Sequence, residues 1–266
     1  MQFALAGAAL AVLDVAEPER KVRRSLAIAS DWRALRIHEI GSAAPPDRPA
    51  RPDRPELLPA TRVKKRRIGP GATGRIALLH ALAHIELNAV DLAWDIVARF
   101  TGEDLPRDFY DDWVQVADEE ARHFELLADR LAALGAAYGD LPAHDGLWEA
   151  ALETKHDLLA RLAVVPLVLE ARGLDVTPAM IEKLQAVGDA DSAAALQVIY
   201  DEEIGHVAIG RRWFQWLCER RGLEPAPTWQ ALVRKHFRGQ LKRPFNEAGR
   251  QQAGLPQDWY VPLADG

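Results

Sequence analysis

Apolar residues recur at the spacing of an α-helix along most of the chain. Positions i, i+3, i+4 and i+7 are apolar in each long segment, which is the pattern of a helix with one buried face. The predicted helices cover residues 76–100, 107–134, 147–171, 177–188, 191–221 and 228–239, after one or two helices within residues 3–35. No segment shows the alternation of a convincing β-strand. The pattern therefore predicts an all-α fold.

Glycine and proline set the predicted helix ends. Glycine after the last turn and proline in the first turn are the usual stop and start signals. The predicted stops are Gly102, Gly135, Gly173, Gly188 and Gly222. Thr177 and Pro178 predict the start of a separate short helix, because threonine caps a helix and proline suits its first position. Pro166 removes one hydrogen bond from the third long helix, which predicts a bend there.

Two segments lack helical periodicity. Residues 41–74 are rich in proline, arginine and glycine, so extended chain is expected there. The basic run at residues 62–67 is expected to be a solvated strap on the bundle; the alternative is a contact with phosphate or an acidic partner. Residues 243–266 predict an extended tail. The predicted organisation is N-terminal helices and strap at 1–74, a four-helix bundle at 75–222, and a C-terminal helix and tail at 223–266.

The composition is that of a soluble globular protein. Of the 266 residues, 48% are hydrophobic and 27% charged, and the net charge of -6 argues against a general nucleic-acid surface. The apolar residues 1–15 lack the basic start of a signal peptide, and Asp14 lies where cleavage would fall. The single cysteine, Cys218, excludes an internal disulfide and a cysteine-based metal cluster. We expect a cytoplasmic protein with no membrane span.

Two short motifs carry the candidate chemistry. Glu120 and His123 form Glu-x-x-His in one predicted helix, and Glu203 and His206 form the same motif in another. On a helix this spacing places a carboxylate and an imidazole on one face, one turn apart. One such motif is weak, because Glu-x-x-His also occurs on solvated helix faces. Two of them at matched positions indicate a metal site.

An isolated glutamate precedes each motif in an apolar segment. Glu86 lies 34 positions before Glu120, and Glu170 lies 33 positions before Glu203. A glutamate on an apolar helix face is unfavourable unless it is paired or binds a metal. The repeated order matches the ligand set of a carboxylate-bridged di-metal centre in a four-helix bundle. The sequence therefore predicts two helical hairpins that close around shared cations.

The donor set restricts the metal. Four carboxylates and two imidazoles without a thiolate suit iron or manganese better than zinc. Glu120 and Glu203 are the expected bridging ligands, because a carboxylate offers two oxygens. Of the other expected ligands, Glu86 and His123 bind one ion, and Glu170 and His206 bind the other. We expect two metal ions, which are iron, manganese or a mixed pair.

Neighbouring polar residues have weaker assignments. Glu119 and Glu202 lie one residue before the motif glutamates; they either hydrogen-bond to the metal-binding imidazoles or face water. Tyr200, three residues before Glu203, is either a radical or proton relay in the pocket or a core aromatic.

Three histidines outside the motifs are not expected to be ligands of the di-metal centre. His80 and His84 are one turn apart, but His84 points about 200° around the helix from Glu86. We expect His84 to support the site or to have a structural role. His156 lies almost four turns before Glu170, too far for the same centre.

Several of these segments resemble a bacterial ferritin-like family, the domain-of-unknown-function 455 family. The similar segments are residues 80–89, 119–124, 142–148, 169–175 and 201–210. The resemblance covers roughly residues 5–255. It implies a ferritin-like fold and a di-iron-type site at the six ligands above, but no reaction, because the family has none assigned. The architecture is more distantly similar to that of a di-iron tRNA hydroxylase, rubrerythrins and fatty-acid desaturases.

Three functions agree with the sequence. The first is oxidation or hydroxylation of a small molecule or modified nucleoside by activated dioxygen. The second is iron handling, as a ferroxidase or peroxide scavenger, and the third is a non-enzymatic binding module that metals only stabilise. A monomer or homodimer is expected, since the extra segments would obstruct a storage shell. Nucleic-acid binding through residues 62–67 and 234–243 is the less favoured alternative.

Overall fold

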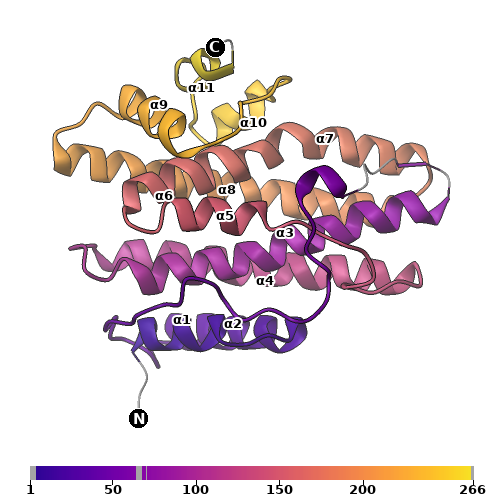
Figure 1. The fold of residues 1–266 in the computed structure, drawn as a ribbon, viewed down its shortest axis with the longest axis horizontal. Coiled ribbons are helices and arrows are strands. Elements are labelled where there is room, and N and C mark those ends of the chain that lie inside the picture. Colours follow the sequence, from indigo (N-terminus) through magenta and orange to yellow (C-terminus); the bar gives the residue numbers. More distant parts are fainter. Residues whose placement is uncertain (1–3, 64–67, 70, 265–266) are drawn as a thin grey trace. The chain divides into compact units, whose positions relative to one another are not determined.

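The computed structural model describes residues 4–63, 68–69 and 71–264, and within these residues the fold is all-α, as predicted (Figure 1). The chain divides into two compact units, an N-terminal unit (Met1–Trp148) and a C-terminal unit (Glu149–Gly266). Leu57 and Ala143 form an isolated β-bridge, and the described residues contain no strand. The three-part organisation predicted from the sequence stays a prediction.

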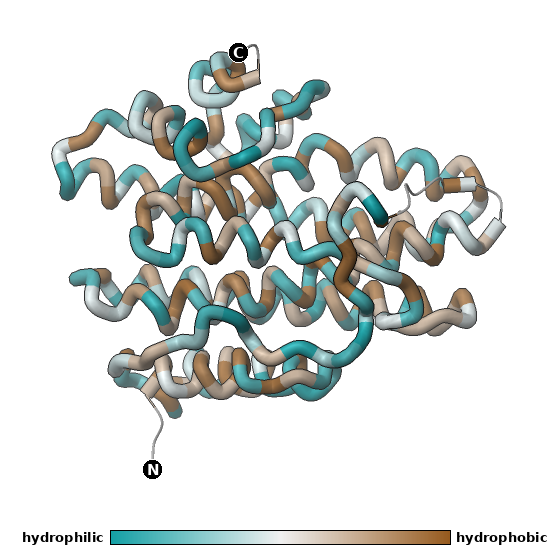
Figure 2. Tube along the Cα trace, viewed as in Figure 1, coloured by the Kyte–Doolittle hydropathy of each residue, from teal (hydrophilic) through white to brown (hydrophobic). Residues whose placement is uncertain are grey.

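A helical hairpin forms the core of the N-terminal unit. Helix α3 (Ala72–Arg99) and helix α4 (Arg107–Ala133) pack along their length, and the short connection between them makes the pair antiparallel (Figure 1). Helices α1 (Leu5–Leu13) and α2 (Pro18–Arg33) cover α3 and α4 respectively. The prediction of one or two helices within residues 3–35 is confirmed, with two observed, and apolar residues recur along all four elements (Figure 2).

A shared serine joins three of these helices. Trp94 of α3 donates from Nε1 to Ser25 Oγ of α2 at 2.7 Å, and Ser25 Oγ donates to the Ala117 carbonyl of α4 at 3.0 Å. Ser25 and Trp94 are fully buried. Because buried polar groups need partners, this chain of hydrogen bonds fixes the rotation of α2 against the hairpin.

Helix α3 is buried on almost every side. It is 28 residues long, and its most apolar 18-residue window has a mean hydropathy of 1.4, so by length and composition it could cross a membrane. However, 78% of that window is buried within the protein. Such burial is expected of the core helix of a globular domain.

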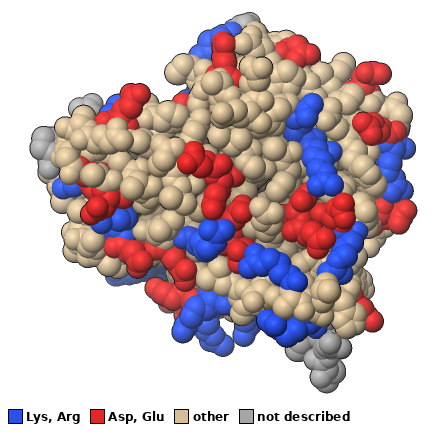
Figure 3. Space-filling model, turned by 180° about the vertical axis from the view of Figure 1, so that it is seen from behind, with Lys and Arg blue, Asp and Glu red and all other residues tan. Residues whose placement is uncertain are grey.

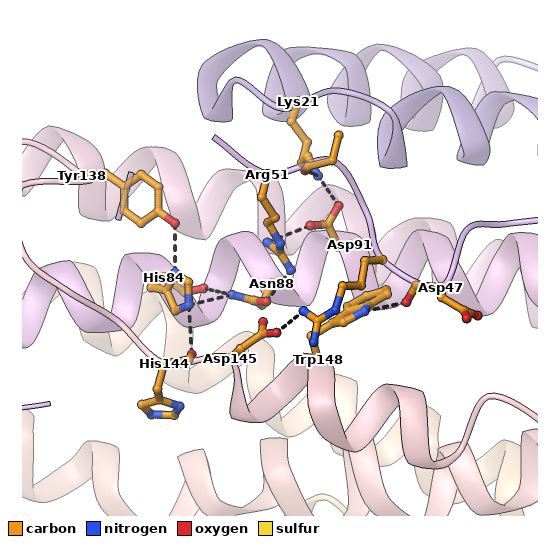
Figure 4. Close-up of polar contacts among 12 residues, drawn as sticks. Lys21, Asp47, Arg51, His84, Asn88, Asp91, Tyr138, His144, Asp145 and Trp148 are labelled. Atoms are coloured by element: carbon orange, nitrogen blue, oxygen red, sulfur yellow. Dashed lines mark hydrogen bonds and ion pairs between the residues drawn. The ribbon is translucent and has the colours of Figure 1, made fainter. Parts of the chain in front are cut away.

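The proline-rich segment packs on α3 through charged side chains (Figure 4). Asp91 of α3 is fully buried and pairs with Lys21 of α2 and, at 3.0 Å, with Arg51 of this segment. Arg51 also donates to Asn88 of α3. Residues 41–59 form no helix, as predicted, and a 3-10 turn, η1 (Ala60–Arg62), follows them. Of the predicted basic strap, residues 64–67 lie outside the described residues.

The C-terminal unit is built on a long helix, α8 (Ala190–Arg221). It packs against α6 (Leu158–Val164), a π-helical segment η2 (Val165–Glu170) and α7 (Ala171–Ala186). Helix α9 (Pro225–His236) packs on α6, where Trp229 donates from Nε1 to the Ala163 carbonyl at 3.0 Å. The predicted bounds of α8 and α9 agree with the structure to within a few residues.

The prediction of one helix over residues 147–171 is wrong. The chain breaks after α5 (Gly146–Glu153), and α6 begins with its own N-cap, the Asp157 side chain, which accepts a hydrogen bond from the Leu159 N–H at 3.1 Å. A side-chain acceptor at this position satisfies an N–H that would otherwise lack a partner in the first turn. The cap therefore starts a new helix.

Gly173 and Thr177 also do not have their predicted roles. The chain stays helical from Ala171 to Ala186, so Gly173 ends no helix, and Thr177 and Pro178 lie inside α7. Leu174, Ile181 and Leu184 are buried on one face of this helix. Their packing outweighs the local start and stop signals, since tertiary contacts commonly override helix propensity.

The C-terminal tail is helical rather than extended. It forms α10 (Glu247–Gln252) and α11 (Gln257–Ala264). The Asn246 side chain caps α10 by accepting from the Gly249 N–H at 3.1 Å, and Trp259 and Tyr260 of α11 are buried. Helices of one or two turns are too short to show periodicity, which explains the error.

Acidic and basic side chains are interspersed on the face drawn in Figure 3. This mixture agrees with the modest net charge of -6.

Candidate metal centre

Three predicted ligands meet inside the α3–α4 hairpin. Glu86 of α3 and Glu120 and His123 of α4 are 3%, 0% and 0% exposed. The Nδ1 atom of His123 lies 3.5 Å from Glu86 Oε2 and 3.4 Å from Glu120 Oε2. One donor atom from each of the three side chains lies within 4.8 Å of the others. The N-terminal unit thus contains a buried carboxylate–imidazole cluster that could bind a metal.

Burial changes the protonation of this cluster. Desolvation, and after it the charge of Glu120, raise the pKa of the Glu86 carboxyl to about 8, and the neighbouring His123 limits the rise. Two carboxylates at such a depth repel each other and lose their hydration. A proton or a cation must compensate for them, and a metal ion can compensate for both carboxylates at once. The residues therefore fit an oxygen- and nitrogen-ligated metal.

The second motif has the same local geometry in the C-terminal unit. His206 of α8 is fully buried, and its Nδ1 atom lies 3.8 Å from Oε2 of Glu203, whose side chain is 13% exposed. Glu170 is the last residue of η2, and its Oε2 atom is inaccessible to solvent. In both units the Nδ1 atom of the histidine faces the glutamate three residues earlier.

The π-helical segment before Glu170 was not predicted. A π-helix has one residue more per hydrogen-bonded turn, so it rotates later side chains by about 100° relative to an α-helix. Pro166 lies in its first turn and packs closely on α8, where a Cβ at Gly210 would lie 2.4 Å from Pro166 Cβ. The bend predicted at Pro166 is thus a change of helix type. It sets the direction of Glu170.

The predicted supporting residues have identifiable contacts. Glu119 accepts a hydrogen bond from Gln115 Nε2 at 3.0 Å and lies 3.8 Å from Arg122 Nη2. Glu202 is half-buried on α8. A role for either glutamate in orienting an imidazole stays a prediction.

Tyr200 contacts the C-terminal segment. Its hydroxyl accepts a hydrogen bond from Asn246 Nδ2 at 2.8 Å, next to the first turn of α10. This contact helps to hold α10 on α8, and the predicted relay role of Tyr200 stays a prediction.

Tyr138 contacts both His80 and His84, and the sequence did not predict this role for it. Its hydroxyl lies 2.9 Å from Nδ1 of His84 (Figure 4). Its ring stacks on His80 with centroids 5.4 Å apart. His84 Nε2 lies 3.1 Å from the His144 carbonyl, and His80 Nε2 accepts from the Gly139 N–H at 2.9 Å. Both histidines thus join α3 to residues 138–144. Tyr138 lies in a non-periodic loop, so spacing gave no signal for it.

These features define an all-α protein with a buried carboxylate–imidazole cluster. The family described as "protein of unknown function (DUF455)" matches residues 14–261, so this chain belongs to that family. An uncharacterized protein of Haemophilus influenzae is 40% identical over 236 residues, which cover 85% of this chain and 81% of the relative. No solved structure matches the chain. The family resemblance seen in the sequence is confirmed, and neither comparison names a reaction.

Proposed function

We propose that this protein is a di-metal carboxylate oxidoreductase of ferritin-like architecture that activates dioxygen to oxidise or hydroxylate an organic substrate. The observation that carries the proposal is the buried cluster of Glu86, Glu120 and His123. The repeat of the same ligand order at Glu170, Glu203 and His206 supports a second ion.

In this proposal each residue has a role set by its donor atoms. Glu86, Glu120 and His123 of the N-terminal unit would hold one ion. Glu170, Glu203 and His206 of the C-terminal unit would supply the ligands of the other. Nδ1 is the expected donor of both histidines, because this atom faces the motif glutamate in each unit. Iron is the favoured metal, with manganese or a mixed pair as alternatives.

Two adjacent redox-active ions supply two electrons to dioxygen, which one ferrous ion alone cannot do. The protein supplies the environment for this chemistry. The apolar side chains around Glu120 exclude water, and exclusion of water strengthens the electrostatic interactions within a site. Glu86 retains its proton at neutral pH in the metal-free protein, because burial raises its pKa to about 8. That proton leaves when a cation binds.

Iron handling and a purely structural metal are the competing functions. A ferroxidase would oxidise many ferrous ions per protein and need no organic substrate. A structural metal would not react with dioxygen at all. A small molecule or modified nucleoside as substrate, a monomeric or dimeric state and a cytoplasmic location remain parts of the proposal.

Anaerobic reconstitution with ferrous iron followed by exposure to oxygen tests the proposal. Absorption and Mössbauer spectroscopy should report two irons per chain that are oxidised together. Glu120→Gln should lose this signal. The matched control is Glu125→Gln, which changes an exposed glutamate on the same helix and should retain both irons. Binding of fewer than two irons, or two irons inert to oxygen, would overturn the proposal, and continuous iron turnover would favour ferroxidase activity.

A further inference from the structure

A second group of metal-binding side chains lies in the C-terminal unit, outside the Glu-x-x-His motifs. His236 is the last residue of α9, and Glu153 is the last residue of α5. His236 is only 7% exposed, and its Nδ1 atom makes no hydrogen bond with any residue that the structure describes. That atom lies 4.0 Å from Glu153 Oε1. A buried polar nitrogen is thus directed at a carboxylate beyond hydrogen-bonding distance.

His156 brings a second imidazole to the same place. It is exposed, in the turn between α5 and α6, and its ring centroid lies 5.5 Å from that of His236 at an interplanar angle of 51°. Two imidazoles on one tetrahedral zinc ion have centroids about 5 Å apart. Two donor atoms of such an ion lie about 3.3 Å apart, so the 4.0 Å gap between His236 and Glu153 closes with a movement of less than about 1 Å.

Neighbouring contacts fix this arrangement. The hydrogen bond from Trp229 to the Ala163 carbonyl holds α9 on α6. Arg238 Nη2 binds Glu153 Oε2 at 3.2 Å, so Oε1 is the oxygen that faces His236. Asp157 is nearby, but its Oδ1 atom already accepts from the Leu159 N–H and Arg221, each at 3.1 Å. The available donors are therefore two imidazoles and one carboxylate oxygen.

We propose that Glu153, His156 and His236 bind one divalent transition-metal ion such as Zn²⁺, with water as a fourth ligand. Two nitrogens and one oxygen are a common zinc donor set. Burial lowers the pKa of His236, with Lys235 and His156 adding to the effect, so its imidazole is neutral and able to bind a metal at pH 7. The ion joins the end of α9 to the α5–α6 turn. This inference does not depend on the proposed oxygen chemistry.

Zinc titration of the metal-stripped full-length protein tests this site. Wild-type protein should bind one more zinc equivalent than His156→Ala, whose side chain is exposed and whose fold should therefore be unaffected. Glu153→Gln should weaken that equivalent at least tenfold. His38→Ala, the matched control at another exposed histidine, should bind zinc as wild type does.

Cobalt(II) gives an independent readout. A four-coordinate cobalt ion at this site should produce visible absorption bands that Glu120→Gln retains and His156→Ala loses. Equal zinc stoichiometry and affinity in wild type, His156→Ala and Glu153→Gln would overturn the inference. Loss of the same equivalent in His38→Ala would also overturn it, because the binding would then be nonspecific.

Discussion

The two units carry the same ligand order on different backbones. In the N-terminal unit Glu86 lies within α3, a continuous α-helix of 28 residues. In the C-terminal unit Glu170 ends a π-helical segment that contains Pro166 in its first turn. The motif histidine nevertheless presents Nδ1 to its glutamate in both units, at 3.4 Å and 3.8 Å. The Glu-x-x-His geometry is therefore a property of one helix, whereas the direction of the upstream glutamate depends on packing.

The motif glutamates also differ in exposure. Glu120 is fully buried, whereas the side chain of Glu203 is 13% exposed. Solvent compensates part of the charge of an exposed carboxylate, and a buried one needs a cation more strongly. We therefore expect the two halves to respond unequally to substitution.

The largest expected effect comes from the motif glutamates. Glu120→Gln should lower iron affinity at least a hundredfold, because the variant loses a charged donor oxygen of the buried cluster. It should also stabilise the metal-free protein, since it removes a buried charge. Glu203→Gln should lose the metal with a smaller gain in stability. Metal analysis and thermal unfolding measure both effects, and equal unfolding temperatures for the two metal-free variants would contradict the proposed difference.

A glycine-to-alanine pair tests the packing around the π-helical segment. Gly210→Ala places a Cβ 2.4 Å from Pro166 Cβ, so it should destabilise the protein by about 1–3 kcal/mol through overpacking. Gly205→Ala is the matched control on the same helix, with nothing within 4 Å of its Cβ, and should stabilise by about 0.5–1 kcal/mol. Urea unfolding measures both. A neutral Gly210→Ala would show that η2 does not depend on this contact.

The raised pKa of Glu86 predicts the pH dependence of the N-terminal cluster. The folded state holds a proton with a pKa of about 8, against 4.5 for an ordinary glutamate. The metal-free protein should therefore lose stability as pH rises from 4.5 to 8, by at most about 1.4 kcal/mol per pH unit.

Metal affinity should change in the opposite direction and increase with pH up to about 8, because the cation displaces the Glu86 proton. Unfolding and iron titrations between pH 6 and pH 9 measure the two trends. Glu86→Gln should flatten the stability trend, and Glu119→Gln should retain it. A stability trend unchanged in Glu86→Gln would assign the proton to another group.

The smallest expected effect of a substitution concerns helix capping, which also differs between the two units. The N-cap residues of α3 and α4, Gly71 and Pro106, make no side-chain cap, whereas Asp189 caps α8 by accepting from the Ser192 N–H at 3.1 Å. Asp189→Ala should reduce the free energy of unfolding by about 1 kcal/mol. Asp189→Asn keeps an acceptor, so it should reduce the free energy of unfolding by much less than Asp189→Ala does. Chemical denaturation distinguishes them, and equal losses would exclude the capping explanation.

The long helices were predictable because each has many periods and a clear end. The prediction of 191–221 matches α8 (Ala190–Arg221), where Gly222 has a left-handed φ of 63°. The π-helical segment was not predictable from spacing, because Pro166 packs on Gly210, a residue distant in the sequence, and periodicity carries no information on such a contact. The short helices of the tail were missed for lack of length.

The cluster in the N-terminal unit followed from residue type and spacing, since both motif residues lie on one helix face. The contacts of His80 and His84 did not, because Tyr138 reaches them from a loop. Local periodicity therefore identifies candidate ligands on helices and misses the partners that loops contribute.

The ion pairs of Asp91 on α3 have a consequence for how far the protein can be shortened. Asp91 is fully buried only because Lys21 and Arg51, both far upstream, neutralise it. A truncated protein that begins at Ala72 would keep every proposed iron ligand but would lose both cations that pair with Asp91, together with helices α1 and α2, which cover α3 and α4. Removal of the first 71 residues should therefore expose the apolar surface of the hairpin and yield an insoluble or misfolded product.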